Sequence, residues 1–193
     1  MARWDPGTQE RLTKAALELF QEHGYDGVTV TQIAERAGIT RRSYFRYFPD
    51  KREVLFAGSE RLPVAVSDAL LDADEAAPPL SAALDALSRV GSQLTAHVDH
   101  SAERRALIDS STELQERERT KIASVTTAIR DALVRRGVQA DRAELVARIA
   151  TVAFQGAFGR WIDARGQSDF PSCLRTVTTE LRQAVAADAE ARH

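Results

Sequence analysis

The side chains of this sequence best placed for chemistry form a basic cluster near the N-terminus. The seventeen residues from Arg36 to Arg52 hold six Lys or Arg side chains and one acidic residue, Asp50, a local net charge of +5 in a chain of net charge −2. Clustered guanidinium and ammonium groups bind phosphate, and a guanidinium group can also bind the edge of a guanine base. The cluster therefore predicts contact with nucleic acid, and a solvated helix face is the alternative interpretation.

Two short helices must carry this cluster, and capping residues mark where they begin and end. Thr29 followed by Gln32 is a capping box, which predicts a helix over 29–37. Gly38 can adopt the left-handed conformation that ends a helix, and Thr40 is a suitable N-cap for the next one. Apolar residues at helical spacing give the first of these helices one buried stripe: Val30, Ile33, Ala34 and Ala37.

The second helix, expected over 41–48, has an unusual outer face. Tyr44 and Phe48 are four residues apart and can share the buried side, so the opposite side carries mainly guanidinium groups and aromatic edges. Two helices joined by a glycine turn, the second with a cationic outer face, are typical of a helix-turn-helix. In that motif the second helix lies in the major groove of DNA.

Further helices on both sides complete this first domain. The spacing of apolar residues predicts a preceding helix over 8–23. After Pro49, a second capping box that begins at Asp50 predicts another helix. Lys51 and Arg52 lie in the first turn of that helix, where the helix dipole does not favour positive charge, so an external anion is the simplest reason for them.

At these residues the sequence resembles the DNA-binding domain of the tetracycline-repressor (TetR) family of bacterial regulators. The resemblance rests on 33–40, on 43–48 and on Lys51, and it covers about a quarter of the chain, from about Thr8 to about Phe56. It implies that the second helix enters the major groove, that Lys51 holds a phosphate, and that the protein is a repressor with a small-molecule inducer.

Two positions depart from the common pattern of the family. Phe45 stands where a tyrosine is usual, so a phosphate-directed hydroxyl is missing, and Arg42 stands where a small residue is frequent. The operator sequences of other members therefore cannot be transferred to this protein.

The candidate DNA contacts differ in chemistry. Arg41, Arg42 and Arg46 are candidates for guanine edges or phosphates. Phe45 can make an apolar contact with a thymine methyl group or a sugar, and Thr31, at the start of the preceding helix, can contact the backbone or a base. Four further residues are candidates for positioning phosphates: Thr40, Ser43, Tyr47 and Lys51.

The remaining chain predicts an all-α protein with a second, larger helical domain. We place the helix-turn-helix DNA-binding domain at 1–54 and an effector-binding and dimerisation domain at 55–193. The charge-dense segment 113–121 is interpreted as a solvated helix face. Apolar spacing predicts helices over 55–72 with a bend at Pro63, 80–98, 103–136 with a break at 110–112, 141–164 and 170–189.

The last two helices are candidates for pairing with a second copy of the chain. The helix over 141–164 is apolar around more than half of its circumference, so it needs two partners, one of which can be a second subunit. A homodimer would suit an inverted repeat in the operator, and packing within one monomer is the alternative. Small residues would let a partner helix approach closely, and the last helix has apolar residues at coiled-coil-like intervals. These residues are Ala153, Gly156, Ala157 and Gly159, then Leu174, Val177, Leu181 and Val185.

Aromatic residues of the second domain are candidates for an effector site. Phe154, Phe158 and Trp161 could line an apolar cavity with His97 among its polar groups, although ordinary core packing explains the same rings. His97 and His100 could begin a metal site, but no third ligand follows at a recognisable spacing, so we expect no metal.

Composition and the motifs present reduce the number of functional classes to which the protein can belong. A single cysteine excludes an internal disulfide framework, and the absence of an apolar signal core or long apolar run predicts a soluble, cytoplasmic protein without membrane contact. No phosphate-binding loop, nucleophile elbow or paired metal motif is present, so we expect neither an enzyme nor a cofactor. The sequence predicts a DNA-binding transcriptional regulator whose partners are double-stranded DNA and an unknown small-molecule effector. The alternatives are a helical small-molecule carrier that keeps a helix-turn-helix shape, and an activator or constitutive regulator without ligand.

Overall fold

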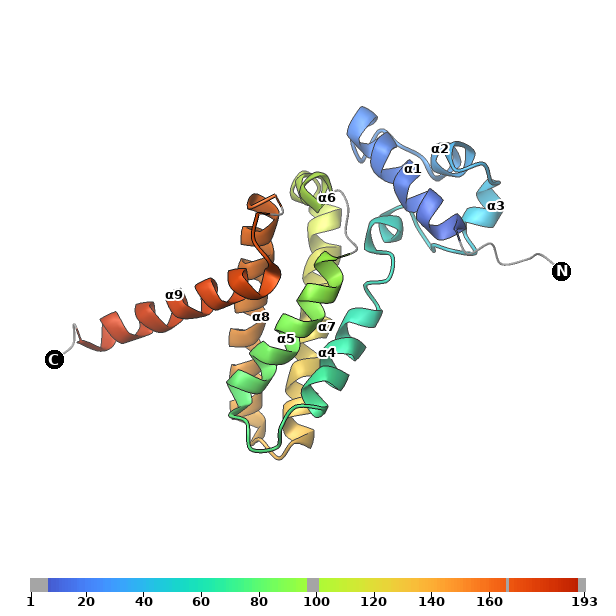
Figure 1. Cartoon of the computed structure of the whole chain (residues 1–193). Coiled ribbons are helices and arrows are strands. Elements are labelled where there is room, and N and C mark those ends of the chain that lie inside the picture. The colour runs from blue at the N-terminus through green and yellow to red at the C-terminus, as the bar shows by residue number, and fades with distance from the viewer. Residues whose placement is uncertain (1–6, 97–100, 166, 191–193) are drawn as a thin grey trace. The chain divides into compact units, whose positions relative to one another are not determined.

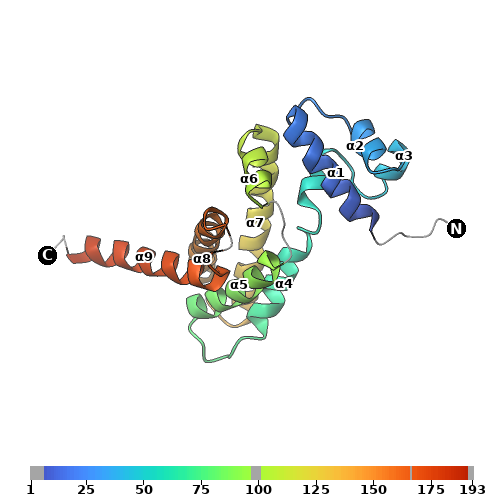
Figure 2. The ribbon, with the colours of Figure 1, turned by 45° about the horizontal axis from the view of Figure 1, so that its top comes forward.

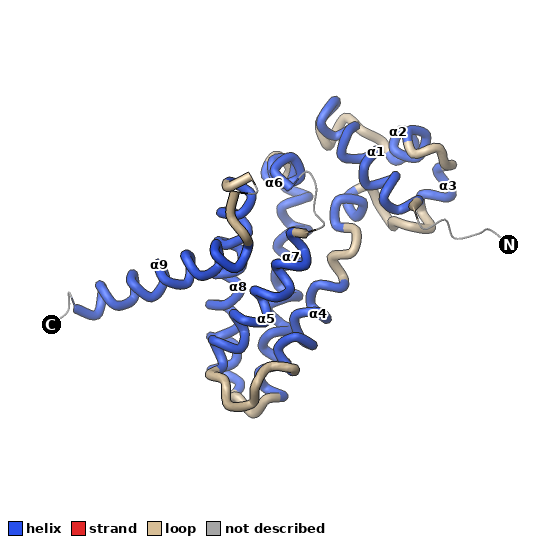
Figure 3. Tube along the Cα trace, viewed as in Figure 1, coloured by secondary structure: helices blue, strands red, loops and turns tan. Residues whose placement is uncertain are grey.

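The computed structural model describes residues 7–96, 101–165 and 167–190, and every regular element in these ranges is helical (Figures 1 and 3). The predicted all-α class is confirmed. None of the helices in these ranges is both long and apolar enough to cross a membrane. In chain order the elements are α1 (Thr8–His23), α2 (Val30–Arg36), α3 (Arg41–Tyr44), the 3₁₀ helix η1 (Arg52–Phe56), α4 (Arg61–Leu71), α5 (Pro79–Thr95), α6 (Ser101–Asp109), α7 (Thr112–Arg135), α8 (Ala140–Asp163) and α9 (Phe170–Glu190).

The chain forms two compact units, each with its own core. The first contains residues 1–60 and 100–120, and the second contains residues 61–99 and 121–193. The first unit extends beyond the segment 1–54 assigned to DNA binding, because α6 and the start of α7 bury Leu107, Ile108 and Leu114 in its core. The boundary at 54/55 therefore stays a proposal about function, while the packing unit is larger.

In the first unit, α1 packs against α2, η1 and α6, and α2 packs against α3. The predicted stripe of α1 is buried, and so are the apolar residues of α2 and the aromatic residues that follow it. The largest fully buried side chains of this core are those of Leu12, Phe20, Val28, Ile33, Tyr44, Val54 and Leu114. The small helices around the basic cluster are thus supported by one continuous apolar core.

In the second unit, α5 contacts α4, α8 and α9, and α8 also packs along α9. The C-terminal half of α9 projects away from the other helices of this unit (Figures 1 and 2), and its residues 182–187 are all exposed. Gly91 allows α5 to approach the start of α9 closely, because a Cβ atom there would lie 2.1 Å from the ring of Phe170.

Several predicted helix boundaries agree with the structure. The helix expected over 8–23 is α1, and the break expected at 110–112 separates α6 from α7. The helix expected over 80–98 is α5, which ends at Thr95, two residues before the undescribed segment 97–100.

The helix expected over 41–48 is shorter than predicted. Its α-helical part, α3, ends at Tyr44, and a turn follows in which the amides of Arg46, Tyr47 and Phe48 donate to the carbonyl oxygens of Ser43 and Tyr44. The last turn is tighter than an α-helix, because the amides of Arg46 and Tyr47 bond three residues back, and Pro49 then prevents the helix from continuing past Phe48.

The helix expected over 55–72 with a bend at Pro63 was also predicted wrongly. The chain after Asp50 forms η1 and then a turn at 57–60, in which Gly58 has a φ of +77°. Pro63 lies in the first turn of α4, where the amide that proline lacks would have no helical partner. The interruption therefore lies at the glycine turn.

Candidate nucleic-acid interface

The helix-turn-helix begins at the predicted capping box. The hydroxyl of Thr29 accepts a bond of 3.3 Å from the amide of Gln32, and the side-chain oxygen of Gln32 accepts one of 2.8 Å from the amide of Thr29. Gly38 has a φ of +72°, and the amide of Ile39 reaches back to the carbonyl oxygen of Ala34 at 2.9 Å. This left-handed glycine ends α2 and turns the chain toward α3.

A polar cap and a buried tyrosine hold α3 in place. The hydroxyl of Thr40 accepts from the amide of Ser43 at 3.1 Å. The ring of Tyr44 is fully buried, and its hydroxyl donates to the carbonyl oxygen of Asp50 at 3.0 Å. Burial, reinforced by the nearby carboxylates of Asp50 and Glu53, raises the pKa of Tyr44 far above its usual value, so the hydroxyl remains a donor.

Helix α3 and the turn that follows it expose four residues, Arg41, Arg42, Phe45 and Arg46, which we call the reading face. Phe45 is 45% exposed, and the guanidinium group of Arg41 lies 5.5 Å from the centre of its ring. The side chains of Arg42 and Arg46 form no hydrogen bond or ion pair with any residue that the structure describes. Two guanidinium groups are thus available for an external ligand, and a third is stacked on an exposed ring.

The other predicted DNA contacts surround the reading face. Thr31 and Thr40 are exposed, and Ser43 and Tyr47 are half-buried. The Thr40 hydroxyl also lies 3.0 Å from that of Ser43. The structure therefore places these residues on the same two helices and turn, in contact with solvent.

Three of the six basic side chains in the cluster are engaged within the protein. Arg36 pairs with Glu22 at 2.9 Å, and Arg52 pairs with Asp50 at 2.9 Å. The ammonium group of Lys51, which is half-buried, donates to main-chain carbonyl oxygens. Lys51 and Arg52 thus both have partners within the fold, and the expected contact of Lys51 with a phosphate stays a prediction.

Sequence analysis missed the support beneath the helix-turn-helix. Two guanidinium groups lie over the buried ring of Phe56, that of Arg104 at 5.0 Å and that of Arg117 at 4.8 Å from its centre. Arg117 also donates to both carboxylate oxygens of Glu53, at 2.5 and 2.9 Å. Segment 113–121 is thus not only a solvated face. The spacing of its charges carried no signal of this, because Glu53 is 64 residues away in the sequence.

The aromatic residues proposed for the effector site lie together in the second unit. Phe154 is buried, with its ring centre 5.4 Å from that of Phe170 and 6.1 Å from that of Phe158. The ring of Trp161 lies 5.5 Å from that of Phe158. His97 lies outside the described residues. The rings pack against one another, and their role in binding an effector stays a proposal.

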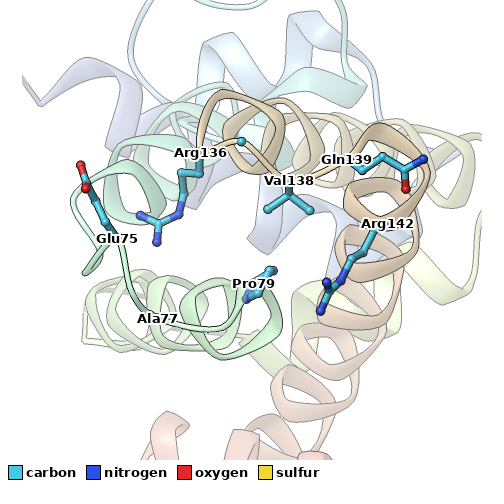
Figure 4. A pocket seen from close by; sticks show the side chains of 8 residues that line it. Glu75, Ala77, Pro79, Arg136, Val138, Gln139 and Arg142 are labelled. Carbon is cyan, nitrogen blue, oxygen red and sulfur yellow. The ribbon is translucent and has the colours of Figure 1, made fainter.

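A hollow of about 370 Å³ lies in the second unit, where the α4–α5 and α7–α8 connections meet. Arg136 and Arg142 line it (Figure 4). Arg136 is occupied, because it donates to the carbonyl oxygens of Leu70, Ala73 and Asp74 at 2.6 to 3.1 Å. This arginine therefore ties the end of α4 to the end of α7.

Known proteins share both the sequence of the helix-turn-helix and the fold. Residues 12–57 match the profile described as bacterial regulatory proteins, tetR family. The chain is similar to the HTH-type transcriptional regulator TcmR of Streptomyces glaucescens, with 39% identity over 82 residues, or 42% of this chain and 34% of TcmR. It is also similar to the uncharacterized HTH-type transcriptional regulator Rv2250c of Mycobacterium tuberculosis, with 30% identity over 157 residues, or 78% of this chain and 82% of Rv2250c. FadR of Bacillus subtilis, solved in complex with stearoyl-CoA, has the same fold, with a TM-score of 0.57 and 18% identity over 87% of this chain and 94% of FadR.

The extent of these matches differs. The chain spans about a quarter to a third of the length of several curated relatives that it matches. The similarity to Rv2250c instead extends over most of both chains. Together with the family profile at the helix-turn-helix, it shows that this chain belongs to the TetR family of DNA-binding transcriptional regulators, which are not enzymes.

Proposed function

We propose that this regulator binds an operator through the reading face and represses transcription until a small-molecule effector releases it. The observation that carries the proposal is that the reading face exposes guanidinium groups that have no partner among the described residues. Arg42 and Arg46 are exposed without a partner among the described residues, while the other cations of the cluster are compensated within the fold or stacked on Phe45. Uncompensated guanidinium groups on a short, capped helix suit the major groove.

Each residue of the interface has a proposed role. Arg42 and Arg46 contact guanine edges or phosphates, and Arg41 does so from its position over the ring of Phe45. Phe45 makes an apolar contact with the DNA. Thr40, Ser43 and Tyr47 position phosphates through their hydroxyl groups, and Thr31, at the start of α2, contacts the backbone or a base.

We propose further that the protein acts as a homodimer through α8 and α9. One side of α8 exposes Leu145 (59%), Ile149 (38%) and Val152 (55%), which follow one another at helical spacing. On α9, Val185 is 73% exposed. A stripe of large apolar residues on one helix face is typical of a surface that another chain covers.

Small residues contribute to this arrangement differently from the prediction. Ala153 and Ala157 are buried within the chain, and a Cβ atom on Gly156 would lie 3.2 Å from the Val177 side chain of α9. Gly156 therefore lets α9 approach α8 in the same chain, and we assign the contact with a second copy to the exposed large apolar residues of α8. In a dimer the two copies of α3 should lie about 34 to 36 Å apart, or a multiple of that, to meet successive major grooves.

The proposed effector binds in the second unit, near Phe158 and Trp161, which are half-buried beside the buried Phe154. FadR, which has the same fold, was solved with stearoyl-CoA, so this fold can hold a small molecule. A hundredfold release from DNA requires the effector to favour the form that does not bind DNA by about 2.7 kcal/mol.

The test is a selection of duplexes from a randomised library by the full-length protein, followed by titration of the selected duplex. We expect an inverted repeat, bound as one dimer in analytical ultracentrifugation. Failure to enrich any duplex above a control protein would refute the proposed operator binding. Enrichment of a single half-site, bound by one chain, would refute the dimer.

A further inference from the structure

Arg117, near the start of α7, makes a two-point contact with Glu53 of η1. Its guanidinium group donates from Nε and Nη2 to the two carboxylate oxygens, at 2.5 and 2.9 Å. Only 21% of each side chain is exposed, so dissolved salt screens this ion pair weakly. A bidentate pair of arginine and carboxylate fixes the orientation of both groups as well as their distance. The start of α7 therefore holds η1 in a defined orientation.

From Glu53, hydrogen bonds continue to the anchor of α3. The amide of Glu53 donates to a side-chain oxygen of Asp50 at 3.0 Å, and the carbonyl oxygen of Asp50 accepts from the hydroxyl of Tyr44 at 3.0 Å. Tyr44 is the fully buried residue of α3, and the reading face consists of residues of α3 and of the turn after it. Two hydrogen bonds thus connect the residue that Arg117 orients with the residue that anchors the reading face.

Glu53 has no equivalent replacement for Arg117 among its other contacts. Arg52 lies 3.7 Å from the same carboxylate, but its closer partner is Asp50, at 2.9 Å. Removing one partner of a largely buried ion pair leaves the other charge uncompensated, which is unfavourable. Without Arg117, the carboxylate of Glu53 should turn toward water, and residues 50–53 should lose a restraint on their position.

Arg104 of α6 supports the same part of the core without reaching Glu53. Its guanidinium group lies 5.0 Å from the centre of the Phe56 ring, and that of Arg117 lies 4.8 Å from it. The Nε atom of Arg104 donates to the carbonyl oxygen of Leu55 at 2.7 Å. The two arginines thus share a ring, and of the two only Arg117 bonds to the residue that is linked to α3.

We propose that Arg117 is a positioning residue for operator binding, which acts through Glu53 and Asp50 to fix the placement of α3. This inference rests on the proposed function. It extends the set of residues that determine DNA binding to α7, far beyond the segment 1–54 assigned to that role. It also differs from general support of the core, because it requires that the loss of Arg117 change the DNA affinity of the folded protein.

The test compares Arg117→Met with Arg104→Met in the full-length protein. Methionine keeps much of the apolar stem over the Phe56 ring and removes the charge and the donors. The two native side chains are similarly buried, with 21% and 27% exposed, so both variants should have a lower free energy of unfolding. Arg104→Met is therefore the matched control for an effect on stability alone.

The first readout is affinity for the duplex selected by the wild-type protein, measured between about 50 and 200 mM salt at a temperature where both variants are folded. We expect Arg117→Met to bind about tenfold more weakly, because only about a tenth of its molecules should hold α3 in the binding geometry. Its salt slope should stay unchanged, since its guanidinium group faces Glu53 and Phe56 and not DNA. Arg104→Met should bind like the wild type.

A double-mutant cycle shows whether Arg117 acts through Glu53. Glu53→Met should also weaken binding about tenfold. If the two residues act as one unit, the double variant should bind no more weakly than either single variant, whereas independent effects would multiply to about a hundredfold. If Arg117→Met does not fold, Arg117→Lys takes its place, and it should also bind more weakly because an ammonium group lacks the bidentate geometry.

The second readout is amide hydrogen exchange without DNA. We expect the amides of 46–48 and of Glu53 to exchange about tenfold faster in Arg117→Met and at the wild-type rate in Arg104→Met. These amides report the turn after α3 and the bond to Asp50.

Four results would overturn the inference. Wild-type affinity in Arg117→Met would limit its role to stability, and an equal loss in Arg104→Met would assign the effect to general loosening of the core. Losses that multiply in the double variant would show that Arg117 does not act through Glu53, and a reduced salt slope would show that it contacts phosphate itself. If the wild-type protein enriches no duplex, the proposed function fails, and the exchange experiment still decides whether Arg117 restrains the segment that holds α3.

Discussion

Replacing Arg42 with alanine tests the reading face most directly. The side chain is exposed and has no hydrogen bond or ion pair with any described residue, so the free energy of unfolding should change by no more than about 0.5 kcal/mol. If the guanidinium group contacts a base, its loss should weaken operator binding by about 1 to 3 kcal/mol in each half-site. A dimer contains two such groups, so about 2 to 6 kcal/mol would be lost per operator.

The assay is fluorescence anisotropy with the selected duplex at several salt concentrations, alongside thermal unfolding of each variant. Arg36→Ala is the matched control, since Arg36 belongs to the same basic cluster but pairs with Glu22 at 2.9 Å. We expect this control to leave DNA affinity and salt slope unchanged. If Arg42→Ala binds like the wild type at every salt concentration, Arg42 lies outside the interface. An equal loss in Arg36→Ala would mean that the interface lies elsewhere on the cluster.

The remaining predictions concern packing, association and helix capping. Phe56→Ala removes a buried ring that two guanidinium groups contact. It should reduce the free energy of unfolding of the first unit by about 3 to 5 kcal/mol in urea titrations, and a loss below about 1 kcal/mol would contradict this packing. Val152→Glu places a charge in the exposed apolar stripe of α8 and should yield monomers in light scattering, and dimers of wild-type stability would exclude this face. Hydrogen bonds from the Ser172 side chain and amide hold the pKa of Asp169 below its usual value. The carboxylate of Asp169 should therefore cap α9 fully at pH values above the ordinary aspartate pKa, and the cap should be lost as the pH falls through the lowered pKa of Asp169. The loss should appear as faster amide exchange at 171–174. Asp169→Asn should remove this pH dependence.

Local features of the first unit could be predicted well from sequence. The capping box at Thr29, the left-handed Gly38 and the N-cap at Thr40 are interactions between residues three to five apart, so their chemistry is visible in the order of residues. The burial of Tyr44 and Phe48 and the exposure of the reading face followed from helical periodicity in the same way, and the structure confirms them. The length of the second helix was less predictable, because the amides of Arg46 and Tyr47 bond three residues back instead of four, and Pro49 acts only on the residue before it.

The sequence alone determined the class of fold, the helix-turn-helix and the identity of the side chains that can face DNA, because each depends on contacts within about one turn of helix. Only the tertiary structure decided which cations remain available. Lys51 reaches carbonyl groups 23 and 26 residues away, and Arg117 reaches Glu53 across 64 residues. Such pairs form when the apolar core brings distant segments together, and the charge of a residue in the sequence does not reveal whether the fold already supplies its partner.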